Sequence, residues 1–249
     1  MCIYIYLPFC LSYIVFKRYN EPKFWESFDL SELNLDSLCL LSVLKNRSKN
    51  LYMSFTRVKS LPDDNLRNFG LIALKKFDVS YSSFPKELLG NILENSPQLT
   101  HLSLEGHNLK ELNFEIIATK IKNLEVLNIA MTRGLNSEAL CKLVNNCLSL
   151  TDLNICWSTF IRNGAELKSF ASNCSSQSLK RLNMSGGREH LNDEILINIL
   201  KNFPNLTYLD ISDSTEITGR SIDAILSNLS DLNFLAISRC YKITSRSYL

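Results

Sequence analysis

Several kinds of functional signature are missing from this sequence of 249 residues. Its histidines stand in no triad spacing with a carboxylate or hydroxyl, and no glycine-rich loop precedes a helical pattern. Its eight cysteines lack the short paired spacing of a metal site. Because no group is arranged for nucleophilic attack, proton transfer or metal binding, we expect a chain that is not an enzyme and that holds neither a metal nor a cofactor.

Neither sign of charge predominates in the sequence, and long apolar runs are scarce. Lysine and arginine number 27 against 25 acidic residues, and no basic run alternates with aromatics, so nucleic acid is not an expected partner. The apolar residues 1–16 are interrupted by Pro8 and fall short of the roughly 20 residues that span a bilayer. They also lack a basic start and a small-residue cleavage site. We therefore expect no membrane association and, since the cysteines form no flanking clusters, a reducing compartment.

What the sequence does have is a repeated phrase of leucines. Copies of the pattern Leu-x-x-Leu-x-Leu, with Ile, Val, Met or Phe at some positions, begin at Leu74, Leu99, Leu124, Leu150, Leu179, Leu206 and Leu232. Successive steps of 25, 25, 26, 29, 27 and 26 residues match the length of a leucine-rich repeat. A weaker copy begins at Trp25. A degenerate copy falls around residues 52–58, where the leading leucine is hard to place.

Each repeat divides into a strand and a helix. Leu153 and Ile155 alternate with a polar residue, as in a strand with one buried face. Later in a repeat the apolar period lengthens to three and four, as in a helix with one buried face, at Leu140, Leu143, Val144 and Cys147. Asn136 and Asn192 precede such segments and can cap the free amides of a first helical turn.

The repeats predict an α/β leucine-rich-repeat solenoid, in which a curved parallel sheet lines the concave side and the helices form the convex side. We expect the solenoid over residues 25–249, with about eight to nine repeats, and a separate apolar segment over residues 1–24. Residues that alternate with the buried leucines should point into the hollow, where they give a mixed and lightly charged surface.

One edge of the sheet carries residue types that favour protein binding. Two residues after the Leu-x-Leu core, three of the last four repeats place Trp157, Asp213 and Arg239, and two residues beyond this position come Arg188 and Tyr241. Tryptophan, tyrosine and arginine are enriched at binding hot spots because each joins a large contact area to a directed polar group. We predict that these five residues form one protein-binding rim. The alternative is that they cover neighbouring strand ends and pair with one another.

Several phrases in the sequence resemble F-box proteins with leucine-rich repeats. They are Lys17-Arg18-Tyr19 with Phe24-Trp25, Leu102-Ser103-Leu104-Glu105-Gly106, Leu153-Asn154-Ile155-Cys156-Trp157, Leu182-Asn183-Met184-Ser185-Gly186, Leu209-Asp210-Ile211-Ser212-Asp213-Ser214 and Ile237-Ser238-Arg239-Cys240-Tyr241. The resemblance implies a non-catalytic substrate receptor of a cullin-RING ubiquitin ligase. Such a receptor docks a Skp-type adaptor on a cullin scaffold and works in the nucleus and cytoplasm.

The same resemblance implies two further partners, a phosphorylated protein client such as a cyclin-dependent kinase inhibitor and a small cyclin-kinase accessory subunit. The five rim residues match positions that contact the accessory subunit in the family. Only the end of the F-box, near residues 16–25, has a counterpart here, so residues 1–24 correspond to an apolar segment and an F-box remnant.

Two other functions stay open from the sequence. One is a scaffold that binds proteins without coupling to a ligase. The other is a secreted recognition module, which the five glycosylation sequons at Asn46, Asn173, Asn183, Asn205 and Asn228 would fit.

Overall fold

The computed structural model describes residues 3–4, 26–45, 48–59, 70–110, 112 and 114–244. Its main sheet has ten parallel strands in the order β1-β2-β4-β6-β7-β8-β9-β10-β11-β12. Those strands are β1 (Ile3–Tyr4), β2 (Ser27–Asp29), β4 (Asn50–Tyr52), β6 (Lys76–Asp78), β7 (His101–Ser103), β8 (Val126–Asn128), β9 (Asp152–Asn154), β10 (Arg181–Asn183), β11 (Tyr208–Asp210) and β12 (Phe234–Ala236). A second sheet pairs β3 (Asn34–Asp36) with β5 (Arg57–Lys59).

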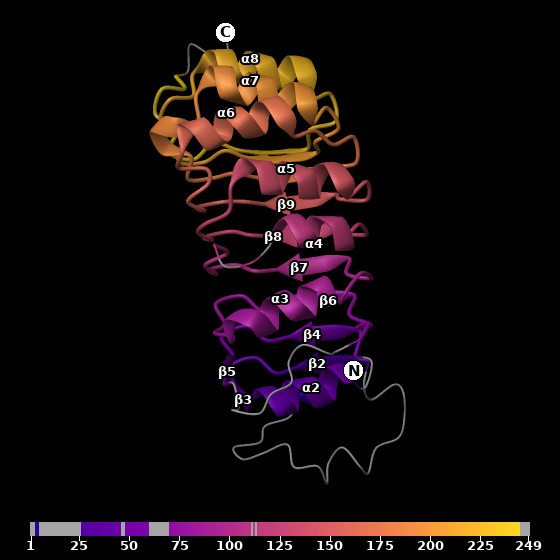
Figure 1. Cartoon of the computed structure of the whole chain (residues 1–249). Helices are drawn as coiled ribbons and strands as arrows, with labels where there is room; N and C mark the ends of the chain where they lie inside the picture. The colour runs from indigo at the N-terminus through magenta and orange to yellow at the C-terminus, as the bar shows by residue number, and fades with distance from the viewer. Residues whose placement is uncertain are drawn as a thin grey trace.

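The helices stack in chain order along one side of the main sheet, as Figure 1 shows from α2 to α8. They are α2 (Ser37–Lys45), α3 (Lys86–Glu94), α4 (Phe114–Lys120), α5 (Ser137–Asn146), α6 (Gly164–Asn173), α7 (Asp193–Asn202) and α8 (Gly219–Asn228), with a 3-10 turn η2 (Arg188–His190). Each repeat contacts the repeats next to it, which makes the chain an α/β solenoid and confirms the predicted fold class.

The alternation of side chains in the strands is the one that the sequence predicts. Leu127, Leu153 and Leu182 are fully buried at the centres of neighbouring strands and lie in register with one another. The residues on either side of them point to the open face of the sheet, opposite the helices, which is the predicted hollow. The main core therefore lies between the sheet and the helix layer.

The predicted helix face and caps are also confirmed. Leu140, Leu143, Val144 and Cys147 are all buried. The side chain of Asn136 accepts a hydrogen bond from the amide of Ala139 at 2.9 Å, and the side chain of Asn192 accepts one from Ile195 at 3.0 Å. Aromatic rings also pack within and between repeats, because Phe170 of α6 lies 5.5 Å from Phe160 in the turn before that helix and 5.8 Å from Phe203 at the end of α7 in the next repeat, measured between ring centroids.

The degenerate second repeat has an identifiable cause. Leu51 pairs in register with Phe77, so the leading position of this repeat is Ser48 rather than a leucine. Ser48 is fully buried and its hydroxyl donates to the carbonyl of Val43 at 3.1 Å. Because its hydroxyl donates a hydrogen bond to the preceding helix, serine can occupy a position that is leucine in other repeats without leaving a buried polar group unpaired.

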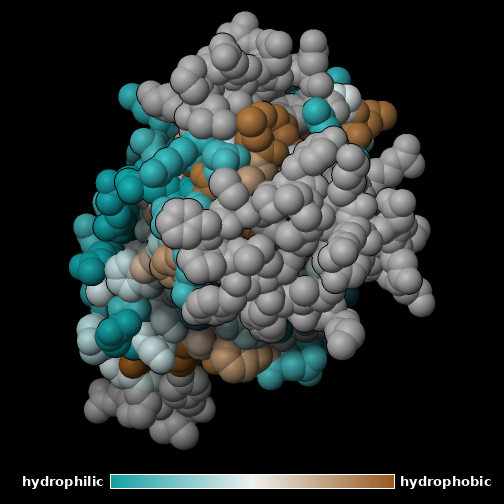
Figure 2. Space-filling model, turned by 90° about the horizontal axis from the view of Figure 1, so that it is seen from below, coloured by the Kyte–Doolittle hydropathy of each residue, from teal (hydrophilic) through white to brown (hydrophobic). Residues whose placement is uncertain are grey.

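The N-terminal boundary differs in part from the prediction. Ile3–Tyr4 forms an edge strand that pairs in parallel with β2, and so adds to the sheet from a segment that was predicted to lie apart from the solenoid. Trp25 and the remainder of residues 1–24 lie outside the described residues, as does the F-box remnant. Viewed from this end of the stack, the described surface is hydrophilic along one flank, with apolar residues in separate patches (Figure 2).

A recurrent side-chain bond ends most of the strands. The last strand residue is Asn or Asp in six repeats, and its side-chain oxygen accepts from the amide two residues later, at 2.9–3.2 Å. Asn154, for example, accepts from Cys156 at 3.2 Å. Such bonds mimic a backbone turn and direct the chain out of the sheet. Much of the polar character of the open face therefore shapes turns.

Acid should weaken one contact between the last two described helices. Asp193 accepts bonds from the hydroxyl of Ser221 at 2.5 Å and from the amide and hydroxyl of Thr218 at 2.9 Å and 2.7 Å. Partial burial acts to raise the pKa of Asp193, but these bonds and the charge of Arg220 outweigh it and leave the pKa below its ordinary value. A lowered carboxyl pKa stabilises the fold above the unfolded pKa, about 3.9, and this contribution is lost as the pH falls through the folded value.

We therefore expect Asp193→Ala to lower the free energy of unfolding by about 1–2 kcal/mol at pH 7, with a smaller difference at pH 3. Urea denaturation at both pH values measures this. Glu194→Ala is the matched control, because Glu194 is an exposed acid on the same helical turn. A deficit that is equal at both pH values would contradict the role of the carboxylate charge.

Candidate protein-binding rim

One position of each repeat has a left-handed backbone. It lies two residues after the Leu-x-Leu core, and its φ angles run from 54° to 87°. The residues are Glu32, Phe55, Tyr81, Gly106, Met131, Trp157, Gly186, Asp213 and Arg239, which we call the rim. Each backbone amide from Glu32 to Asp213 donates to a carbonyl of the next repeat, as Trp157 does to Ser185 at 2.9 Å and Met131 does to Cys156 at 2.8 Å. The backbone thus holds the rim in a fixed row, while its side chains lie at the edge of the sheet.

Trp157 lies against the next repeat. A Cβ atom added to Gly186 would approach the Trp157 ring to 2.7 Å, so only glycine fits beneath it. The guanidinium of Arg188 lies 5.4 Å from the centre of the same ring, within the range of a cation–π contact. The structure therefore brings two of the predicted site residues together as a stacked pair. The indole remains half-buried and lies outside the core.

Asp213 and Arg239 form a two-point ion pair. Nε and Nη2 of Arg239 bond the two carboxylate oxygens of Asp213, each at 2.6 Å. The hydrogen bond and the charge of Asp213 raise the pKa of Arg239 above its ordinary value. A guanidinium has five N–H donors, so the pair leaves donors of Arg239 directed at solvent. The pairing within the ladder that the sequence left open as an alternative is present for these two residues.

Tyr241 is highly exposed, with 75% of its surface accessible. The next residue, Lys242, pairs with Glu216 of the preceding repeat. Together, Trp157 with Arg188, Asp213 with Arg239, and Tyr241 form what we call the C-terminal rim cluster. The cluster contains the apolar face of an indole, an arginine held in an ion pair and an exposed phenol, which are groups suited to binding another protein.

Sequence reasoning gave too little weight to the earlier part of the rim. Phe55, Tyr81 and Met131 are all substantially exposed although they are large and apolar. Phe55 and Tyr81 stack in parallel, with ring centroids 5.1 Å apart and an interplanar angle of 9°. The available signal was the rim position itself, which places aromatic and sulfur-containing side chains at the same offset as Trp157.

The open face of the sheet carries a second group of contacts. Arg181 forms an ion pair with Asp152 at 2.9 Å and lies 4.0 Å above the centre of the Tyr208 ring. Tyr208 in turn stacks on Phe234, with centroids 4.5 Å apart. Asn183 also lies on this face, and its side-chain oxygen accepts a hydrogen bond from the amide of Ser185 in the turn that follows. These contacts hold the side chains in place, so the C-terminal part of the open face is an ordered and partly aromatic surface.

Three further features of the described residues bear on function. No cluster of His, Cys, Asp and Glu among them could hold a metal ion. No described helix has the length and apolar character needed to cross a membrane. His107 is part of the turn structure, since its Nε2 lies 2.6 Å from the carbonyl of Val79, and burial lowers its pKa.

The stacked parallel strands, the helix layer and the left-handed rim define a leucine-rich-repeat protein. More specifically, residues 38–249 match the family described as SKP2 LRR domain, and the chain belongs to that family.

Two solved structures are similar to the chain. The yeast complex of Rad7 and Elc1 matches with a TM-score of 0.60 and 16% identity, over 89% of this chain and 58% of the other. A leucine-rich-repeat protein of Leptospira interrogans, LIC12759, matches with a TM-score of 0.43 and 18% identity, over 86% of this chain and 64% of the other. The chain thus spans less than two thirds of either protein.

Proposed function

We propose that this chain is the substrate-recognition subunit of a cullin-RING ubiquitin ligase of the SCF type. It binds a phosphorylated protein client for ubiquitination and proteasomal degradation, and a cyclin-dependent kinase inhibitor is the first client to test. The observation that carries the proposal is the match to the SKP2 leucine-rich-repeat family over residues 38–249. The chain itself binds, while other subunits transfer ubiquitin.

The C-terminal rim cluster is the proposed contact with the small cyclin-kinase accessory subunit. Trp157 provides an apolar anchor, and Arg188 places a positive charge at its face. Asp213 holds the Arg239 guanidinium in one orientation, so that its outward donors can meet carbonyl or carboxylate groups of the partner. An arginine that is already oriented loses less side-chain entropy on binding.

The remaining partners follow from the same proposal. A Skp-type adaptor and a cullin scaffold connect the receptor to the ligase, in the nucleus and the cytoplasm. The proposal includes no cofactor, nucleic acid or membrane. The protein-binding scaffold without ligase coupling is the competing function, because both functions use the same rim.

Co-purification of the full chain with the Skp-type adaptor tests the ligase coupling. We expect a one-to-one complex by intact mass after size-exclusion chromatography. A complex that forms equally with the Trp157→Ala variant would place adaptor binding away from the rim, in agreement with the proposal. Failure of the native chain to form the complex would overturn the coupling and favour the scaffold.

A further inference from the structure

We propose that the rim holds a second docking site, a groove that takes an acidic segment of a protein partner. The groove lies between the turns that follow β6, β7, β8 and β9 and has a volume of about 610 Å³. It uses different residues from the C-terminal rim cluster, apart from Trp157, which lines both. The inference goes beyond the proposed function and does not depend on coupling to a ligase.

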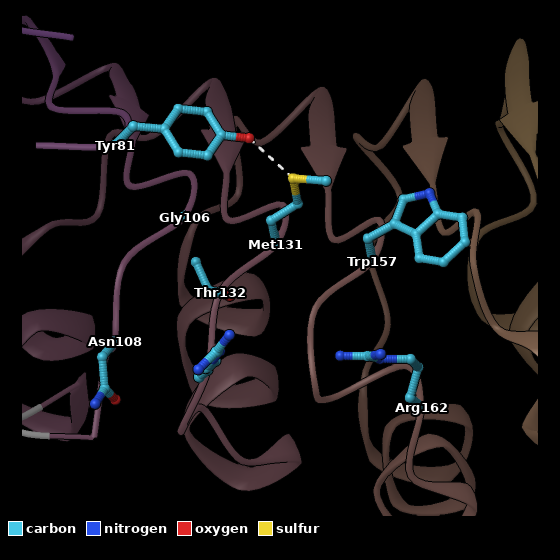
Figure 3. A pocket seen from close by; sticks show the side chains of 8 residues that line it. Tyr81, Gly106, Asn108, Met131, Thr132, Trp157 and Arg162 are labelled. Atoms are coloured by element: carbon cyan, nitrogen blue, oxygen red, sulfur yellow. Dashed lines mark hydrogen bonds between the residues drawn. The ribbon is translucent and has the colours of Figure 1, made fainter. Parts of the chain in front are cut away.

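The upper wall of the groove is apolar. Tyr81, Met131 and Trp157 follow one another along the rim, as Figure 3 shows, with Gly106 between the first two. Tyr81 and Met131 keep 42% and 47% of their surface accessible, so that a partner side chain can cover them. Burying apolar and aromatic surface of this kind contributes most of the affinity at hot spots.

This wall is held in place before any partner arrives. The Tyr81 ring stacks on Phe55, and its hydroxyl donates to Oε1 of Glu105 at 2.7 Å and lies 2.9 Å from the Met131 sulfur. The bond to Glu105, with burial and the negative charge, raises the pKa of Tyr81 to about 12. The phenol therefore stays protonated and bonded at neutral pH. A wall that is already ordered reduces the entropy lost when a partner binds.

Two uncharged polar side chains of the groove are already bonded within the fold. The hydroxyl of Thr132 donates to the carbonyl of Ile129 at 2.6 Å, so its donor is used, and the residue is buried. The side-chain oxygen of Asn108 accepts from the amide of Lys110 at 3.2 Å, which leaves its NH₂ group as a donor. The Glu105 carboxylate beside the wall is occupied on both oxygens, by Tyr81 and by Asn128 at 2.9 Å.

Two arginines complete the groove. Arg133 follows β8 and Arg162 follows β9, and within the described part of the chain neither guanidinium has an ion pair or hydrogen-bond partner. The Arg162 side chain reaches from the turn before α6 into the lower part of the groove, as Figure 3 shows. No acidic side chain lines the groove, so its charge is positive.

A donor-rich, positively charged groove below an apolar wall fits one kind of occupant. Acceptors and negative charge must come from the partner, together with a large apolar side chain for the wall. The two arginines come from different positions of consecutive repeats. They therefore offer two separate charges, which match spaced carboxylates in a chain segment. We assign the groove to a segment in which Asp or Glu residues flank one apolar anchor.

Selection from a random peptide library displayed on phage tests this assignment. The library is selected on the native chain and counter-selected on the Arg133→Gln/Arg162→Gln variant, so that only peptides needing these arginines survive. We expect survivors enriched in Asp and Glu around one Leu, Phe or Trp. No survivors, or survivors without acidic enrichment, would overturn the assignment.

The leading survivor is then measured by fluorescence anisotropy against matched variants. Loss of both arginines should weaken binding by about tenfold or more, as should replacing the peptide's acidic residues by their amides. Lys142→Gln/Lys168→Gln is the control, because it removes the same charge from exposed helix positions of the same two repeats. Equal weakening by the control pair would reduce the effect to general charge attraction and overturn the site.

Discussion

Trp157→Ala should weaken binding to the cyclin-kinase accessory subunit by about 2 kcal/mol or more while the melting temperature stays nearly unchanged. The indole contacts Gly186 and Arg188 at the surface and is not part of the core, so its loss leaves the repeats packed. In a bound complex the same ring would be the largest apolar surface of the C-terminal rim cluster. Isothermal titration calorimetry and thermal denaturation measure the two quantities.

Phe55→Ala is the matched control for this variant. Phe55 is also an aromatic residue at a left-handed rim position, but it lies at the other end of the solenoid and is 62% exposed. It should leave binding of the accessory subunit unchanged. A large fall in the melting temperature of Trp157→Ala would show that the indole serves packing rather than recognition.

Phe170→Ala is expected to have the largest effect on stability, a loss of about 3–5 kcal/mol in the free energy of unfolding. The Phe170 ring is fully buried between the ring of Phe160 in its own repeat and the ring of Phe203 in the next repeat, so truncation leaves a cavity at the boundary of two consecutive repeats. In a solenoid, stability depends on interfaces between neighbouring repeats, and this change damages both the inside of one repeat and its interface with the next. Urea denaturation of the full chain measures the loss.

Phe170→Leu separates the cavity from other causes. Leucine keeps most of the volume, so we expect it to retain at least half of the stability that alanine loses. Equal losses for the two variants would indicate that the orientation of the aromatic rings, rather than the filled volume, stabilises this part of the stack. A loss below about 1 kcal/mol for alanine would contradict the cavity argument.

The repeat pattern was sufficient to predict the architecture because it reports burial directly. The spacing of Leu150, Leu153 and Ile155 states which side chains face the core, and every such position in the central repeats is buried. The second repeat escaped the pattern because Ser48 replaces its leading leucine and satisfies its hydroxyl locally. The strand at Ile3–Tyr4 could not be predicted, since two residues carry no period.

The sequence was sufficient to predict which edge of the sheet carries these residues, but not which of their side chains contact one another. The offset from the Leu-x-Leu core located Trp157, Arg188, Asp213, Arg239 and Tyr241 on one edge. Which of them contact one another depends on register between repeats and on backbone handedness. The left-handed turn was signalled indirectly, by Gly106 and Gly186 at two of the rim positions and by the Asn or Asp that ends most strands. The groove needed the structure, since its walls come from four repeats.

The left-handed position also bears on how the protein could be redesigned. From Glu32 to Asp213 its backbone amide bonds to the next repeat, while its side chain lies outside the core, so core packing does not determine which residue stands there. The exceptions are Gly106 and Gly186, whose Cβ space is filled by the rings of Tyr81 and Trp157. Randomising Phe55, Tyr81, Met131 and Trp157 should therefore generate a library of binders with different specificities on one unaltered scaffold.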